Sequence, residues 1–136
     1  MIFAIKTEIR DPRANTFGFR AQKTMYGGKR IAAGDTIYLF ASENEGGSGL
    51  VARGTVTTAK AIPRTPGLER QTPRVSITVK RPTPARRRLG RTELKSFTAW
   101  SDGQPEAELN FKFYRQATNK IVGLTEETAA FLSKFF

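Results

Sequence analysis

The segment that most constrains the fold of this chain spans residues 33–56, because it has the pattern of a β-hairpin. A Gly-Asp turn signal precedes a β-branched and aromatic run at 36–40, which predicts a strand. A polar, glycine-rich connection at 43–49 leads into a second predicted strand at 50–56. Gly54 inside that strand indicates a bulge or a close approach of another backbone. We therefore expect a strand–loop–strand unit at the centre of the fold.

Three further segments alternate apolar and polar residues, as half-buried strands do. They are residues 3–9, 74–80 and 108–115. Prolines in 61–73 and 82–88 predict loops on either side of the middle strand. Together with the hairpin, these segments supply five expected strands.

Two segments are expected to be helical. Residues 15–26 have apolar side chains at loose helical spacing and end at Gly27, which predicts a short helix or turn after the first strand. Near the C-terminus, Thr125 is a good N-cap, and Glu126 and Glu127 fall in the positively polarised first turn. The pattern as a whole predicts an α+β fold built on a small β-barrel of about five to six strands, with a C-terminal helix.

Composition excludes several kinds of chemistry. The chain has no cysteine and no histidine, so a structural zinc site, a Ser-His-Asp triad and a cysteine nucleophile are impossible. No metal or cofactor is expected, and the lack of cysteines favours a cytoplasmic location. No apolar run approaches the roughly 18 residues of a membrane span, so no membrane partner is expected. We expect residues 1–136 to form a single domain.

The net charge of +11 is concentrated in the middle of the chain. Residues 64–95 contain ten basic and two acidic side chains, whereas residues 96–136 contain four basic and five acidic ones. Such a patch attracts polyanions and favours nucleic-acid phosphates, and the arginine run lacks the apolar face of a membrane-surface helix. The phosphate-binding candidates are Arg53, Arg81, Arg86, Arg87, Arg88 and Arg91.

Short motifs add to the order of the elements. They are Gly18 and Arg20 in FGFR, Ser42 at the end of YLFAS, and Leu124, Thr125 and Glu127 before and inside the last helix. This arrangement resembles the EVE branch of the PUA-like superfamily. The chain departs from the family pattern at Phe17, Ala21, Ala41 and Gly123, and it has Ala-Thr-Asn-Lys at 117–120 where the family has SRLS. The resemblance implies a small barrel that binds RNA or an extruded, modified base.

A base-binding cleft needs an aromatic side chain for stacking and polar groups for the base edge. The candidates are Asn15, Phe17, Gly18, Phe19, Arg20, Ser42, Trp100 and Asn119, with Thr118 as a further polar candidate. Trp100 stands out because its neighbourhood is polar and rich in turn residues. The leading prediction is a non-catalytic nucleic-acid-binding module that prefers RNA to DNA.

Two alternatives remain open at this stage. Gln22-Lys23-Thr24 resembles part of the helix motif of the ASCH branch, which implies a nucleoside or RNA hydrolase that uses Lys23 and Thr24. A ribosome- or partner-associated protein whose basic loops bind structured RNA without a base pocket is the other alternative.

Overall fold

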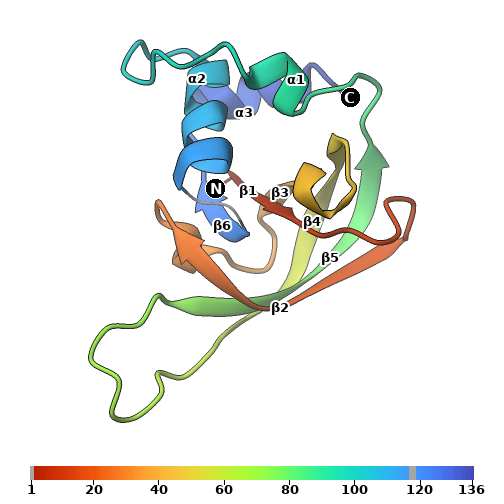
Figure 1. Ribbon diagram of the computed structural model, residues 1–136. Coiled ribbons are helices and arrows are strands. Elements are labelled where there is room, and N and C mark those ends of the chain that lie inside the picture. Colours follow the sequence, from red (N-terminus) through yellow and green to blue (C-terminus); the bar gives the residue numbers. More distant parts are fainter. Residues whose placement is uncertain (1, 117–118) are drawn as a thin grey trace.

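The computed structural model describes residues 2–116 and 119–136, within which six strands close into a barrel (Figure 1). The strands are β1 (Ile2–Thr7), β2 (Thr16–Met25), β3 (Thr36–Ala41), β4 (Gly49–Ala61), β5 (Arg74–Pro84) and β6 (Lys120–Gly123). Their order around the barrel is β1-β3-β4-β5-β2-β6. The β1–β3 and β2–β6 pairs are parallel, and the other four pairs are antiparallel. The predicted α+β barrel with a C-terminal helix is confirmed.

The helices gather at one end of the barrel, at the top of Figure 1. They are α1 (Arg91–Leu94), α2 (Pro105–Asn110), the π-helical segment Phe111–Gln116 that continues α2, and α3 (Glu126–Ser133). Short 3-10 turns occupy Gly28–Arg30 and Glu43–Glu45. Within the described residues, no helix is long and apolar enough to cross a membrane.

The helices give β1 a second buried face. Phe3 and Ile5 point into the barrel with Ile37 and other apolar side chains, whereas Ala4 packs in a separate core between the barrel wall and the helices. The prediction of a half-buried strand at 3–9 is therefore wrong in two respects. The strand ends at Thr7, and its second face is covered by protein instead of solvent.

The segment 15–26 is a strand and not the predicted short helix. Phe17 and Phe19 alternate with exposed residues as strand side chains do, but the register with β5 shifts between Phe19 and Gln22. Ala21 lies at this bulge with a φ of 50°, and its amide donates to Ser76 Oγ at 2.8 Å. The bulge interrupts the two-residue period and so imitates helical spacing in the sequence.

The segment 108–115 is helical and not the predicted strand. Pro105 occupies the first turn of α2 together with two glutamates, which is a common helix start. Leu109 and Phe113 are four residues apart and both fully buried against the barrel wall. Phe111 falls between them in the apparent alternation but is only partly buried. A helix therefore fits the burial better than a strand does.

The central hairpin is confirmed. β3 and β4 pair antiparallel, and the register between β4 and β5 shifts between Arg53 and Thr55. A Cβ atom at Gly54 would collide with Val79 Cγ1 and lie 3.2 Å from the Lys80 carbonyl oxygen, so the expected close approach exists. Both β4 and β5 are longer than predicted, and β5 continues through the proline-containing 82–84 segment.

The C-terminal helix is fixed to α2 by one carboxylate. Thr125 caps α3 by accepting from the Thr128 amide at 3.2 Å. Glu108 accepts from both threonine hydroxyls at 2.6 Å and from Lys112 Nζ at 2.8 Å. Burial opposes ionisation of Glu108, but these hydrogen bonds and the Lys112 charge hold its pKa below the usual value. The helical layer is therefore held as one unit over β1 and β3.

Candidate functional site

A lysine is buried beneath the helical layer. Lys6 lies on the face of β1 opposite the barrel interior and is 1% exposed. Its ammonium lies 4.2 Å from the centroid of the Tyr114 ring and 4.0 Å from Glu43 Oε1. Burial lowers the pKa of Lys6; Glu43 opposes this effect, and the nearby Arg91 charge adds to it. A buried cation is costly unless it has partners, so this position is typical of a functional group.

Glu43 links the parts of this site. Its Oε2 atom accepts from the Arg91 amide at 2.6 Å and from the Tyr114 hydroxyl at 2.9 Å. Burial opposes its ionisation, but the hydrogen bonds and the Lys6 charge hold the Glu43 pKa below the usual value. Burial and the bond to Glu43 raise the Tyr114 pKa far above its usual value, so the hydroxyl remains a donor. Among the described residues, Glu43 Oε1 is buried without a hydrogen-bond partner.

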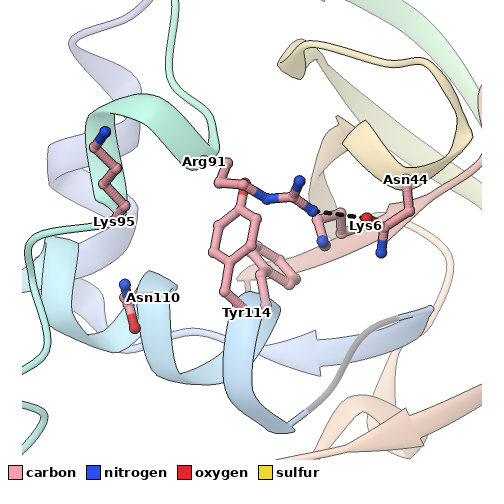
Figure 2. A pocket seen from close by; sticks show the side chains of 7 residues that line it. Lys6, Asn44, Arg91, Lys95, Asn110 and Tyr114 are labelled. Carbon is pink, nitrogen blue, oxygen red and sulfur yellow. Dashed lines mark hydrogen bonds between the residues drawn. The ribbon is translucent and has the colours of Figure 1, made fainter.

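Lys6, Arg91 and Tyr114 border a cavity of about 280 Å³ between β1 and the helices, whereas Glu43 lies behind its wall. Figure 2 shows Tyr114 and the Arg91 guanidinium at one wall, with Arg91 reaching toward Asn44, and Lys95 and Asn110 at the other. Arg91 donates to Asn44 Oδ1 at 2.8 Å. The lining residues are Lys6, Asn44, Arg91, Lys95, Asn110, Phe113 and Tyr114. The cavity combines three cationic side chains with two aromatic ones, which suits a small planar ligand rich in hydrogen-bond acceptors.

Trp100 is connected to this cavity through Asn110. The indole Nε1 donates to Asn110 Oδ1 at 2.8 Å, and Asn110 Nδ2 donates to the Leu94 carbonyl at 2.8 Å. The Trp100 ring is 42% exposed and lies against Phe111, with a centroid separation of 5.3 Å. Trp100 therefore lies outside the cavity, but it is one hydrogen bond away from a lining residue.

Two of the predicted site residues lie beside Lys6. Ser42 is buried and directly precedes Glu43, and its amide donates to the Thr7 carbonyl at 2.9 Å. The Asn119 amide donates to the Lys6 carbonyl at 3.0 Å. Both therefore position the cavity wall, although neither lines the cavity. The candidate Thr118 lies outside the described residues.

Some of the predicted phosphate-binding arginines lie at the helical end of the barrel, where the cavity is. Arg91 lines the cavity, and the exposed Arg86, Arg87 and Arg88 occupy the connection that leads from β5 into α1. Arg87 stacks over the Phe135 ring at 4.4 Å. Arg53 stacks over the Phe136 ring at 4.8 Å, and Arg81 is exposed on β5. The basic segment is thus distributed along β5, with the arginine run at its helical end.

The remaining base-binding candidates are not part of the cavity. Phe17 and Phe19 are 6% and 7% exposed and lie parallel to each other in the barrel core. With Gly18 they also line a separate hollow of about 400 Å³ beside the loop between β1 and β2, so their stacking role stays a prediction. Asn15, Gly18 and Arg20 are exposed at the start of β2, and none of them lines the Lys6 cavity.

The hydrolase alternative requires Lys23 and Thr24 to act together. They are adjacent on β2, where Thr24 is buried and donates to the Pro73 carbonyl at 2.9 Å, whereas Lys23 is exposed. Adjacent strand residues point to opposite faces, so the two side chains do not share a face of β2. In the part of the chain that the structure describes, no group of three or more Asp or Glu side chains is placed to hold a metal ion.

Sequence reasoning missed Lys6, Glu43 and Tyr114. Lys6 was expected on a solvent face, and Tyr114 was assigned to a strand that does not exist. The available signal was chemical: a lysine within an otherwise apolar strand, which is unusual where both faces are covered. That both faces are covered follows only from the helices, which come from distant parts of the sequence.

Comparisons with known proteins identify the fold. No protein-family model matches the chain, and no curated protein matches its sequence. The solved DUF55 domain of human thymocyte nuclear protein 1 superimposes with a TM-score of 0.65 at 17% identity, covering 98% of both chains. Human THYN1 in complex with DNA containing 5-methylcytosine superimposes with a TM-score of 0.63 at 17% identity, covering 98% of this chain and 96% of that one. A Pseudomonas putida protein gives 0.62 at 13% identity, covering 99% of both.

The superpositions extend over nearly the full length of these neighbours. At such low identity the likeness concerns the fold alone. The chain has the fold of the PUA-like, EVE-type domains.

Proposed function

We propose that this protein is a nucleic-acid-binding module whose Lys6 cavity takes a single pyrimidine base, with cytosine or 5-methylcytosine preferred. The observation that carries the proposal is a buried lysine at the wall of a small cavity. Behind that wall, 4.0 Å from Lys6 Nζ, lies Glu43 Oε1, which has no hydrogen-bond partner among the described residues. A volume of about 280 Å³ is at the low end for ligand sites, which favours one ring over two.

The proposed preference follows from hydrogen-bond complementarity. Cytosine presents an amino donor beside ring acceptors, whereas uracil and thymine present a carbonyl acceptor at the same position. Glu43 Oε1 is a buried acceptor, and Lys6 Nζ, 4.0 Å away, is a donor. We propose that the base enters as far as Glu43, which is hydrogen-bonded to the lining residues Arg91 and Tyr114, so that Oε1 accepts from the cytosine amino group while Lys6 donates to the neighbouring acceptor. Uracil would leave the carboxylate facing a carbonyl oxygen.

A solved neighbour supports a nucleic-acid ligand. Human THYN1, which shares the fold, has been solved in complex with 5-methylcytosine-containing DNA. The charge of the present chain, +11, is consistent with a polyanionic partner. The preference for RNA over DNA remains a prediction from the sequence, and the experiment below compares both.

The binding test uses the single tryptophan. We expect Trp100 fluorescence to change when single-stranded oligonucleotides carrying one central cytosine or 5-methylcytosine are added, because Asn110 connects the indole to the cavity. Replacement of that base by uracil should weaken binding by roughly 10- to 100-fold, which corresponds to the usual 1–3 kcal/mol per base-specific contact. The titration is run with RNA and with DNA of the same sequence.

Equal affinity for all bases together with unchanged Trp100 fluorescence would overturn the base-reading proposal. Binding that is equally strong for RNA and DNA would overturn the RNA preference only. A variant that keeps the tryptophan but loses its bond, Asn110→Ala, should bind with a smaller fluorescence change, and an unlabelled competition assay checks its affinity.

The arginine run should supply phosphate contacts. Replacing Arg86, Arg87 and Arg88 by alanine is expected to weaken binding uniformly across sequences, since these side chains are exposed next to α1. Each lost contact lowers the slope of log affinity against log salt by about 0.7 for single strands, so the slope should fall by roughly 2. A changed base preference at unchanged slope would contradict this role.

A further inference from the structure

A second hollow lies at the end of the barrel opposite the helices. It has a volume of about 630 Å³ and lies where the loop between β4 and β5 projects away from the barrel, at the lower left of Figure 1. Its lining includes five cationic side chains, namely Lys23, Lys29, Arg64, Arg70 and Arg74, and, among the residues that the structure describes, no carboxylate. Ile62 and Leu68 are exposed apolar residues of the same lining. A site of this composition attracts a polyanion.

The loop that forms this hollow is held in place by its own hydrogen bonds. Gln71 accepts from the Thr65 amide at 2.7 Å and donates to the Thr65 and Leu68 carbonyls at 2.7 and 2.8 Å. The Thr24 hydroxyl on β2 donates to the Pro73 carbonyl at the end of the loop and so holds that end against the barrel. Because the loop is already ordered, a ligand pays less conformational entropy on binding.

A cationic track connects this hollow with the helical end. β2, β4 and β5 contain no Asp or Glu. Val75, Ile77 and Val79 of β5 face the barrel core, which places Arg74 and Lys80 on the outer face. The exposed Arg20 and Lys23 on β2, and Lys60 on β4, flank them on the neighbouring strands. The track ends near the arginine run 86–88.

We propose that the hollow and this outer face form a second nucleic-acid contact, which binds phosphates outside the Lys6 cavity. The choice of nucleic acid as the polyanion rests on the proposed function, but the site itself shares no residue with the cavity. β5 has 11 residues, and at about 3.3 Å per residue it spans roughly 35 Å, the length of about ten base pairs. The site therefore fits an extended strand or duplex and not a single phosphate.

The test compares two charge reversals of equal size. The double variant Lys23→Glu/Arg70→Glu changes two cations of the hollow whose side chains have no hydrogen bond or ion pair within the described residues. The control, Arg13→Glu/Lys134→Glu, changes two exposed cations elsewhere. The probe is an unmodified DNA duplex of about 20 base pairs, measured between about 50 and 200 mM salt. We expect the hollow variant to bind the duplex at least tenfold more weakly, and its slope of log affinity against log salt to fall by about 2. The affinity of the control should fall less than threefold.

Equal losses in both variants would show that only net charge matters and would overturn the inference. Stronger binding of polyglutamate than of the duplex would overturn it too, in favour of an acidic protein partner. The hollow variant should keep the preference for cytosine over uracil. If the protein shows no preference for cytosine but the hollow variant loses affinity for the duplex, only the proposed function fails. If the preference is present but the hollow variant binds as the control does, only this inference fails.

Discussion

Replacing Lys6 by methionine is expected to lower the affinity for cytosine-containing oligonucleotides by roughly 10- to 100-fold. Lys6 is the buried donor of the cavity, and a hydrogen bond to a charged group contributes about 1.5–3 kcal/mol. Methionine has a similar length and no charge, so it fills the space of the lysine stem. Fluorescence anisotropy with the cytosine and uracil oligonucleotides measures the change, and the difference between the two bases should shrink.

Stability must be followed in parallel, because Lys6→Met leaves Glu43 without its neighbouring cation. The double variant Lys6→Met/Glu43→Gln removes this unpaired charge and should restore folding stability without restoring binding. Lys134→Met, at the end of α3 and exposed, is the matched control and should bind as the unmodified protein does. Unchanged affinity and base preference in Lys6→Met would rule out the cavity as the base site.

A large loss of folding stability is expected for Gly28→Ala. Gly28 is buried at the start of the 3-10 turn after β2, and a Cβ atom there would collide with the Ile121 carbonyl oxygen and lie 2.7 Å from its carbon. Ile121 belongs to β6, which bridges β1 and β2 and so closes the barrel. Since backbone atoms cannot move aside as a side chain can, the substitution should lower the free energy of unfolding by about 3 kcal/mol. Urea unfolding measures it.

Gly18→Ala is the matched control. Apart from its chain neighbours, no atom of the described residues lies within 4 Å of a Cβ built at Gly18, which is exposed on β2. Alanine should be neutral there or stabilise the strand by about 0.5–1 kcal/mol, because glycine loses more conformational freedom on folding. Midpoints that shift equally in the two variants would contradict the steric account of barrel closure at Gly28.

Local signals in the sequence were reliable where one stretch of chain contains all the relevant contacts. The β3–β4 hairpin, the close approach at Gly54 and the Thr125 cap of α3 all appear as predicted. Segments at 15–26 and 108–115 were assigned the wrong period. In the first segment, a bulge at Ala21 disturbs the alternation that is typical of a strand. In the second, the helix residues Leu109 and Phe113 lie two residues before and after Phe111, which imitates that alternation.

The sequence by itself determined the barrel class, the central hairpin, the capped C-terminal helix and the excess of positive charge. The tertiary structure alone decided that Lys6 is buried, because its cover comes from α1, α2 and the segment that continues α2, more than eighty residues away in the chain. It likewise distributed one basic stretch between the two ends of the barrel, since β5 begins with Arg74 at one end and leads to Arg86, two residues beyond Pro84, at the other. Charge and propensity are properties of a segment, whereas burial and distance depend on which strands pair.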